Sequence, residues 1–366
     1  MAKIVVELDA YVLPDDHAIF KVSPGKTYRF YQEVRRANAI FLDVRGLDML
    51  PGNPKDWPDN KLLEIISDDR WAREVISREK GNDPKGSEGI TRTDRTRLGF
   101  LKALLGEAKR GDLVIVPVEG YAKDVLIGEL LDEPWDTRTI TAPDGEDGTF
   151  NYVGRRVRWR AAQPKRFFSD DMIAALHTQT AMFQLGRSLH EETYRLAYRN
   201  FVYKNNYISE FHTSKSHFTS EDSAVLSAWL NGFEFLSSEI RSDDAQALPE
   251  HFAIMGLSKL PHGVAADLTI NINSPGSFVL KSTGAFSLAL MTMLPLSACS
   301  SKQIIDDGVE IQLKTVGSAD SACSINIEEE VKNYAATLSY DRLQEACELG
   351  RRAQTDAKIT TQARLK

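Results

Sequence analysis

The stretches GDLVIVP (111–117), VLIGELL (125–131) and YVGRRVRWR (152–160) decide the fold prediction for this chain. All three are short and contain Val, Ile or Leu, side chains that pack well on a pleated surface. A Gly-Asp pair opens the first stretch, and the polar segment PDGEDG (143–148) before the third is typical of a hairpin tip. The three stretches therefore predict consecutive β-strands.

The residues before these strands continue the pattern. Further candidate strands, rich in β-branched and aromatic residues, are KIVVEL (3–8), TYRFY (27–31) and ANAIFLDV (37–44). Residues 60–80 and 96–110 carry apolar side chains at helical spacing and predict two amphipathic helices. We therefore expect residues 1–166 to form a mostly β, barrel-like domain.

The pattern changes after residue 166. Ser169 can cap a helix, and Thr219-Ser220-Glu221-Asp222 has the spacing of a capping box. These features predict a helical region over residues 167–245, with the stretch 191–211 inside it. Residues 246–366 alternate again and predict a small C-terminal α+β domain. Its expected elements are strands near 266–273, 309–316 and 322–327, a buried helix at 285–299 and a helix at 328–354. The whole chain is thus predicted to be α+β.

Composition excludes several protein classes. The chain has 366 residues, of which 42% are hydrophobic and 27% charged, which excludes a disordered chain and a collagen-like fibre. Its three cysteines form no CxxC, which excludes a cysteine zinc cluster and fits a reducing compartment. MAKIVVELDAY (1–11) has acids too early for a secretory signal, and the 285–299 run is shorter than the roughly 20 residues of a membrane span. We expect a cytoplasmic protein without a membrane partner.

Basic side chains gather in one short segment of an acidic chain. The formal net charge is −7, yet residues 1–166 hold 28 basic and 28 acidic side chains, so the excess acid lies in residues 167–366. Residues 151–166 carry no acid and six basic side chains, Arg155, Arg156, Arg158, Arg160, Lys165 and Arg166. Such a strip attracts phosphate or another anion. The alternative is a solvated strand face whose arginines pair with the preceding acids.

Motifs for catalysis or metal binding are sparse. Gly25-Lys26-Thr27 resembles part of a phosphate-binding loop, but that loop needs a glycine where this chain has Phe20, and a helix after it. The seven histidines form no HExxH and none lies beside a GxSxG serine, so we expect no metal site.

A metal-dependent nuclease core is an open alternative. It needs an acid on one strand and, on the next, an acid or Gln two residues before a Lys, so that carboxylates hold Mg²⁺ and the Lys stabilises the attacked phosphate. Gln312 and Lys314 supply the second half, with Glu310 upstream and Asp267 on an earlier strand. A pattern this short also arises on the surface of an ordinary α+β domain. Mg²⁺ is expected only if this alternative holds; otherwise we expect no cofactor.

Aromatic residues near cations give a stronger indication of function. Four of the five tryptophans fall in residues 1–166, and the candidates to stack or enclose a base are Trp57, Tyr121, Trp135 and Trp159. Strand alternation places Arg156, Arg158 and Arg160 on one face and Arg155, Val157 and Trp159 on the other. Trp159 is therefore as consistent with a core position as with a site.

The three strands quoted first resemble the end of a small β-barrel of the PUA/EVE-like kind. A version of this module is fused to Mrr-type restriction enzymes and related bacterial defence proteins, and has a Gly-Asp-Leu-Val strand, an Ile-Gly-Glu strand and a basic strand ending in Val-x-Trp. The segment 164–185 resembles the helical stretch that follows it, so the resemblance covers roughly a quarter of the chain. It implies an N-terminal PUA-like β-barrel that senses nucleic acid, often a modified or flipped base, and signals to an effector. The usual Mrr-type spacing from acid to Gln-x-Lys is not found, which favours a sensor or adaptor.

Three functional hypotheses follow. The first is a nucleic-acid-sensing, modified-base-reading component of a bacterial antiviral defence or restriction system. Its six basic residues would contact phosphates, and its four aromatic candidates would form a base pocket. Its partners would be nucleic acid, DNA before RNA, and other subunits of a defence complex. The second is the metal-dependent nuclease, and the third is a structural subunit that docks through its acidic helical half. We favour a non-enzymatic role.

Overall fold

A computed structural model describes residues 4–79, 89–144, 148–204, 206–240, 267–271, 276–282, 309–317, 322–326, 340–360 and 364–365. The chain divides into two compact units. Unit 1 comprises Met1–Asp15 and Tyr198–Lys366, and unit 2 comprises Asp16–Ala197. The three-part division predicted from composition, with boundaries after residues 166 and 245, differs from this one because the first strand of the chain pairs with strands far along the sequence.

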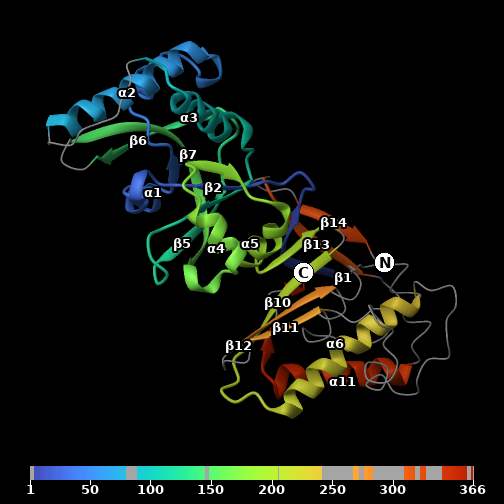
Figure 1. The fold of residues 1–366 in the computed structure, drawn as a ribbon. Helices are drawn as coiled ribbons and strands as arrows, with labels where there is room; N and C mark the ends of the chain where they lie inside the picture. The colour runs from blue at the N-terminus through green and yellow to red at the C-terminus, as the bar shows by residue number, and fades with distance from the viewer. Residues whose placement is uncertain are drawn as a thin grey trace. The chain divides into compact units, whose positions relative to one another are not determined.

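Unit 2 is built on a seven-stranded sheet that curls into a half-barrel (Figure 1). Its strands are β2 (Ile19–Val22), β3 (Ala39–Phe41), β4 (Leu113–Val116), β5 (Asp124–Leu130), β6 (Arg138–Pro143), β7 (Thr149–Pro164) and β8 (Met182–Gln184). They are ordered β3-β7-β5-β4-β2-β8, with β6 paired to β7. Its helices are α1 (Tyr31–Ala37), α2 (Asp59–Glu79), α3 (Arg92–Lys102), α4 (Asp170–His177) and α5 (His190–Ala197).

The long strand β7 produces the curl. Its first half pairs with β3 and β6, and its second half pairs with β5. Within the β5 pairing, Ile127 faces Ala161 but Gly128 faces Trp159, which leaves Arg160 as an extra residue on β7. An extra residue of this kind bends the strand and increases its twist. One strand can therefore belong to both sides of the half-barrel.

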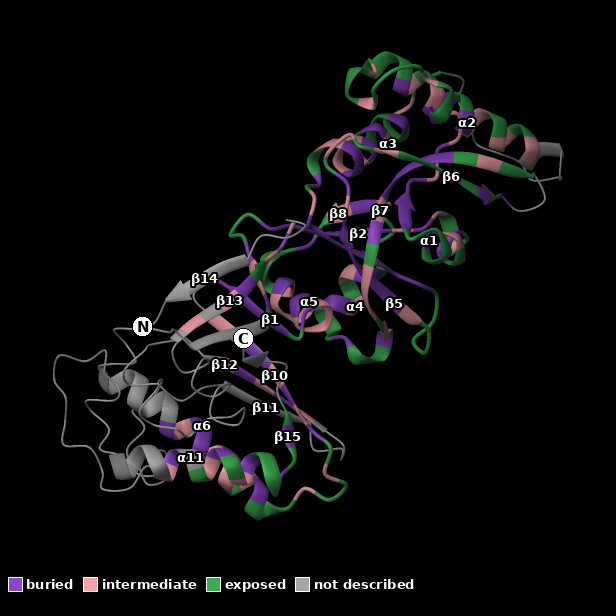
Figure 2. Cartoon of the chain, turned by 180° about the vertical axis from the view of Figure 1, so that it is seen from behind, coloured by how far each residue is buried: buried purple, intermediate pink, exposed green. Residues whose placement is uncertain are grey.

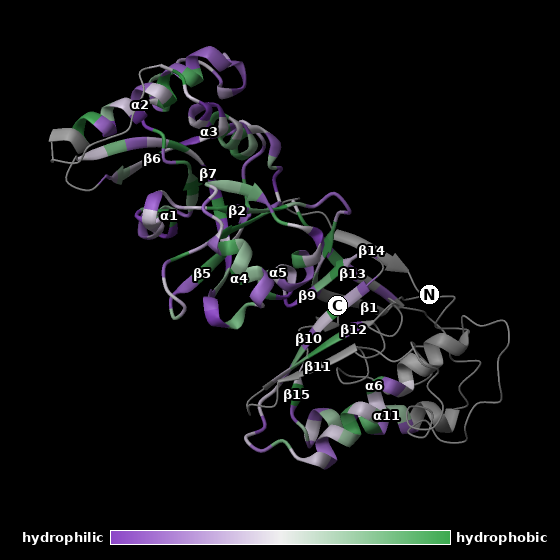
Figure 3. Cartoon of the chain, viewed as in Figure 1, coloured by the Kyte–Doolittle hydropathy of each residue, from purple (hydrophilic) through white to green (hydrophobic). Residues whose placement is uncertain are grey.

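Hydrophobic side chains of these strands form the core of unit 2. Ile40, Val114, Leu126 and Tyr152 are all at most 1% exposed. Figure 2 shows buried residues concentrated on the strands, and Figure 3 shows mixed hydrophilic and hydrophobic residues along α2. Helix α2 is therefore amphipathic, as its spacing predicted.

The sequence predictions for unit 2 are confirmed for most elements. The three stretches that decided the fold form β4, β5 and β7, and the predicted helices form α2 and α3. The prediction of a strand at residues 27–31 was wrong. A 3-10 turn (Lys26–Tyr28) and the start of α1 occupy this stretch. Thr27 and Tyr28 have φ angles of 55° and 60°, which lie outside the range of a β-strand.

Unit 1 contains a nine-stranded mixed sheet with the main order β11-β12-β10-β9-β1-β13-β14. Its strands are β1 (Ile4–Leu13), β9 (Asn200–Tyr203), β10 (Asn206–Thr213), β11 (Asp267–Asn271), β12 (Gly276–Ser282), β13 (Val309–Thr315), β14 (Ala322–Asn326), β15 (Ile359–Thr360) and β16 (Arg364–Leu365). Strand β1 runs parallel to both β9 and β13. Helices α6 (Ser220–Ile240) and α11 (Tyr340–Thr355) lie side by side on one face of the sheet (Figures 1 and 2).

The helical prediction for residues 191–211 was wrong beyond Ala197, where α5 ends. Residues 200–213 form β9 and β10 instead. Strand β9 is buried at all four positions, and a short, continuously buried apolar run cannot be distinguished from a buried helix by its period. The capping box before α6 is confirmed, because Asp222 N donates to Thr219 Oγ1 at 3.3 Å and Thr219 N donates to the Asp222 carboxylate at 2.8 Å. The predicted helix at 285–299 lies outside the described residues.

The α+β class is confirmed. The described residues contain seven α-helices and two sheets. Among these residues, we find no helix that is both long enough and apolar enough to cross a membrane.

Candidate functional site

The predicted phosphate-contacting strip of residues 151–166 does not form as expected, because two of its cations are buried. Arg155 is 0% exposed, and its guanidinium donates to the backbone carbonyls of Leu104 (2.9 Å), Ala108 and Asp132. Lys165 is 1% exposed and donates to Val118 O at 2.6 Å. Burial lowers the pKa of both side chains. Neither can contact a phosphate, since both donate to carbonyls inside the unit.

Two further arginines of the strip are paired with acids of the preceding segment. Arg156 Nε lies 2.6 Å from Asp132 Oδ1, and Arg160 pairs with Glu129. The solvated-face alternative had anticipated this pairing. Arg158 and Arg166 are exposed, with no ion pair among the described residues. Only these two of the six are placed to meet a phosphate directly.

The tryptophans predicted to enclose a base are packed against the core of unit 2. A Cβ at Gly106 would lie 2.1 Å from the Trp135 ring, and one at Gly128 would lie 2.7 Å from the Trp159 ring. Each indole therefore rests on a glycine that leaves room for it. Trp57 donates its ring N–H to a backbone carbonyl six residues earlier. All three indoles are partly buried against this core and none lines the cavity described below, so their assignment to a base pocket stays a prediction.

Tyr121 is the predicted aromatic residue that stays accessible, with 57% of its surface exposed. Its ring meets the His177 ring edge-to-face with centroids 5.9 Å apart, and its carbonyl accepts from Arg166 N at 3.2 Å. Lys165 Nζ lies 3.5 Å from His177 Nε2. The structure thus brings two of the predicted residues, Tyr121 and Lys165, to a histidine that the prediction did not include.

The predicted nuclease residues are not assembled. Asp267 is on β11 and Lys314 on β13, and four strands separate them in the sheet order. At about 4.8 Å between neighbouring strands, this places them roughly 24 Å apart. On β13, Gln312 donates to Glu310 at 3.4 Å, while Lys314 pairs with Asp9 at 2.5 Å. Within the described ranges no group of three or more His, Cys, Asp or Glu residues could hold a metal ion.

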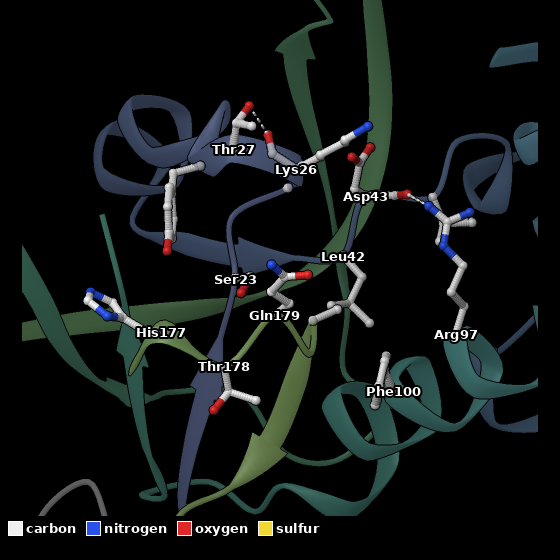
Figure 4. Close-up of a pocket in the computed structure, with 14 residues that line it drawn as sticks. Ser23, Lys26, Thr27, Leu42, Asp43, Arg97, Phe100, His177, Thr178 and Gln179 are labelled. Carbon is white, nitrogen blue, oxygen red and sulfur yellow. Dashed lines mark hydrogen bonds between the residues drawn. The ribbon is translucent and has the colours of Figure 1, made fainter. Parts of the chain in front are cut away.

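A cavity of about 540 Å³, here named the first hollow, opens in unit 2. Its walls come from residues 23–28 after β2, residues 42–44 after β3, Arg97 and Phe100 of α3, and the segment 177–181 after α4. Figure 4 shows Lys26, Thr27 and Asp43 along one edge, Thr178 and Phe100 across from them, and the Gln179 amide between. The volume lies within the range of small-molecule binding sites.

The turn that forms one edge of the first hollow has an unusual backbone. Gly25, Thr27 and Tyr28 all have φ between 55° and 77°. A Cβ at Gly25 would lie 2.7 Å from the Phe30 ring, so this position requires glycine. Phe30 is 1% exposed and its N–H donates to Pro24 O at 2.9 Å, which anchors the turn in the core. Left-handed backbone at non-glycine residues concentrates at ligand sites.

Arginines outnumber aspartates beside the first hollow. Arg29, Arg45, Arg73 and Arg97 surround Asp43, Asp69 and Asp144. Burial alone would raise the pKa of Asp144, but the hydrogen bond from Arg45 and the charge of Arg73 outweigh it and hold that pKa below its usual value. Of the four arginines, Arg97 lines the cavity, and its guanidinium donates to Asp43 O at 3.4 Å.

Two buried lysines add positive charge near the same cavity. Lys21 is 1% exposed and donates to Thr178 O at 2.8 Å and to Thr180 O at 2.6 Å, while burial lowers its pKa to about 8. Lys165 lies beside His177, as described above. Among the described residues, neither lysine makes an ion pair with a carboxylate. Buried positive charges that donate to carbonyls and not to carboxylates contribute a potential that attracts anions.

Most residues of the first hollow were missed by the sequence analysis. Lys26 belongs to the Gly-Lys-Thr stretch, which was considered only as a phosphate loop and set aside. Arg97, Phe100, His177 and Gln179 come from two other elements and form no motif with it. The left-handed turn carries no sequence signal beyond Gly25, because Thr27 and Tyr28 rarely adopt this conformation.

Comparisons with known proteins give no relative, since no family model, curated protein or solved structure matches this chain.

Proposed function

We propose that unit 2 binds nucleic acid and that the first hollow receives an unpaired base. The observation that carries this proposal is the meeting of aromatic rings and cationic side chains in one cavity. Tyr28, Phe100 and His177 supply the rings, and Lys26 and Arg97 supply accessible cations.

The lining matches the chemistry of a nucleotide. A base presents two flat faces that stack on aromatic rings and polar edges that pair with amides and carboxylates. The Gln179 amide and the Asp43 carboxylate both line the cavity. Lys26 is exposed at its edge, where the phosphate attached to an inserted base would lie. A purely apolar ligand would leave these polar groups without partners.

The biological setting belongs to the same proposal. The curled half-barrel is compatible with a PUA/EVE-like module, and the resemblance of strands β4, β5 and β7 to that module supports this identification. In such a setting the chain would report a modified or flipped DNA base to other subunits of a bacterial antiviral defence or restriction system in the cytoplasm. Its role would be that of a sensor without its own catalysis.

Binding of a fluorescein-labelled 12-nucleotide single-stranded DNA tests the proposal. The full chain should bind it with an affinity that falls steeply with salt, because each phosphate contact releases counterions. Lys26→Glu should weaken binding at least tenfold. Lys55→Glu is the matched control, since Lys55 is also an exposed lysine in a 3-10 turn but lies outside the hollow.

Gln179→Ala probes the base edge rather than the phosphate. It should weaken binding of some base sequences and leave the salt dependence unchanged, because an amide releases no counterions. A panel with the four normal bases, 5-methylcytosine and N6-methyladenine reads this selectivity. Absence of binding to every member of the panel at low salt would contradict the proposal, as would equal effects of Lys26→Glu and Lys55→Glu.

A further inference from the structure

A second cavity adjoins the first in unit 2. This second hollow has a volume of about 400 Å³. Its walls come from the 3-10 turn, from α1 and from the loop between β4 and β5. Thr27 and Tyr28 line both cavities, so the left-handed turn is the wall between them.

A buried cation, Lys165, lies behind the Thr27–Tyr28 turn that divides the two cavities. Lys165 Nζ donates to the carbonyl of Val118, which lines the second hollow, and lies 3.5 Å from the ring nitrogen of His177, which lines the first. The same Nζ is 5.9 Å from the centre of the Tyr28 ring. A negative group that passes over Tyr28 from one cavity to the other would therefore lie in the field of Lys165 without touching it.

The second hollow offers its own contacts to a nucleotide. Arg35 and Lys123 are exposed cations that line it, and the described residues place no ion pair on either. Gln32 and Glu119 add polar groups that can pair with a base edge, as amides and carboxylates do. Asp124 also lines this cavity, and its backbone carbonyl already accepts from Tyr31 Oη at 2.5 Å. Cations and acceptors together suit a nucleotide better than a free anion.

We infer that the second hollow binds the nucleotide next to the one whose base enters the first hollow. The Thr27–Tyr28 turn then stands between the two bases. This inference rests on the proposed function and adds to it that the chain reads two successive nucleotides of a single strand. The phosphate that joins them crosses the dividing wall, where Lys165 attracts it, and Arg35 contacts the outer phosphate.

The position of the Thr27–Tyr28 turn between the two hollows explains why the bound strand must be single. Two neighbouring bases in a duplex are stacked on each other, and a protein wall can enter between them only after they unstack. Single strands lose less stacking and pairing energy on such insertion. A duplex of the same sequence should therefore bind more weakly than the single strand.

Displacement of the labelled 12-mer by short ligands tests the inference. The ligands are 5′-deoxynucleoside monophosphates of the bases in the panel above, and the corresponding dinucleotides with a 5′ phosphate. A dinucleotide should displace the 12-mer at a concentration at least tenfold lower than its mononucleotide. Arg35→Ala should raise the dinucleotide concentration about tenfold, the size of one charge-assisted hydrogen bond, and leave the mononucleotide within twofold.

Arg36→Ala is the matched control. Arg36 is the exposed neighbour of Arg35 in the last turn of α1 but does not line the second hollow. The salt dependence gives a second readout, because loss of one phosphate contact should lower the slope for a single strand by about 0.7. Arg36→Ala should change neither quantity.

The outcomes separate this inference from the proposed function. Equal displacement by mononucleotide and dinucleotide, or no effect of Arg35→Ala on either, overturns the two-nucleotide site while binding in the first hollow stands. A 12-mer that binds but is displaced by neither ligand also overturns it. If the 12-mer does not bind at all, the proposed function itself fails.

Discussion

The basic segment of residues 151–166 and the walls of the first hollow both contain cationic side chains, but they assemble them differently. In residues 151–166 the cations are close together in sequence, yet Arg155 and Lys165 are buried on carbonyls and Arg156 and Arg160 are paired with acids. Around the first hollow the cations come from separate elements: Arg97 faces Asp43 and Asp69, Lys21 donates to carbonyls, and Lys26 is exposed at the edge. Proximity in sequence thus says little about accessible charge, because a strand sends alternate side chains to opposite faces.

Among the variants that test this comparison, Arg155→Ala should have the largest effect on the free energy of unfolding. Arg155→Ala removes the donor for three buried carbonyls and leaves a cavity in the core of unit 2. We expect the free energy of unfolding to fall by about 3 kcal/mol or more. Urea unfolding measures it, with Arg158→Ala as the control, since Arg158 is exposed on the same strand. A loss below about 1 kcal/mol would mean that Arg155 is not a structural residue.

His17 extends the comparison to a buried group that stays uncharged. Burial lowers its pKa to about 4, and its ring is hydrogen-bonded to Tyr194 Oη at 2.9 Å and to Gly111 O at 3.0 Å. The unfolded state therefore binds more protons than the folded state between about pH 4 and pH 6.5. The contribution of His17 to the free energy of unfolding should be fully present above pH 6.5 and should fall by roughly 3 kcal/mol as the pH drops to about 4.

Carboxylates also titrate in the lower part of this range, so the measurement compares wild type with His17→Gln. The difference in unfolding free energy between the two proteins should shrink as the pH falls from 7 to 4.5. A difference that is constant over this range would show that His17 is not held neutral.

Gly128 tests the placement of the tryptophans in the core. Gly128→Ala puts a methyl group 2.1 Å from Val157 Cγ1 and 2.7 Å from the Trp159 ring. Overpacking of this kind costs about 1–3 kcal/mol, measured by urea unfolding. Gly120→Ala is the control for added bulk, because nothing lies within 4 Å of a Cβ there, although its positive φ adds some strain. If Gly128→Ala weakened DNA binding without loss of stability, the indole would belong to the site after all.

Four of the seven strands of unit 2, namely β3, β4, β5 and β7, could be predicted from sequence, whereas β2, β6, β8 and the site could not. β4, β5 and β7 follow from local residue type, but the division into units depends on pairs such as Ile4 with Val309, which no local pattern reveals. None of the predicted site residues is among those that line the first hollow, and Tyr121 and Lys165 contact His177, which does. The residues that line the hollow come from separate segments, and the first and last of these, Ser23 and Ala181, are more than 150 positions apart. Only the fold brings them together.

Substitutions in the lining of the first hollow should have the smallest effect on stability. Lys26 and Gln179 are exposed, and the changes Lys26→Glu and Gln179→Ala should each alter the free energy of unfolding by less than about 0.5 kcal/mol. Thermal or urea unfolding of both variants checks this. Stability that is unchanged while DNA affinity falls would distinguish the hollow, as a binding surface, from the structural role of the buried Arg155.

The most direct test of this account compares Lys26→Glu with Arg158→Glu in binding the labelled 12-mer. Both reverse the charge of one exposed cation, the first at the hollow and the second on β7. We predict at least a tenfold loss of affinity for Lys26→Glu and less than a threefold loss for Arg158→Glu. A larger loss for Arg158→Glu would place the nucleic acid on β7 and contradict the account.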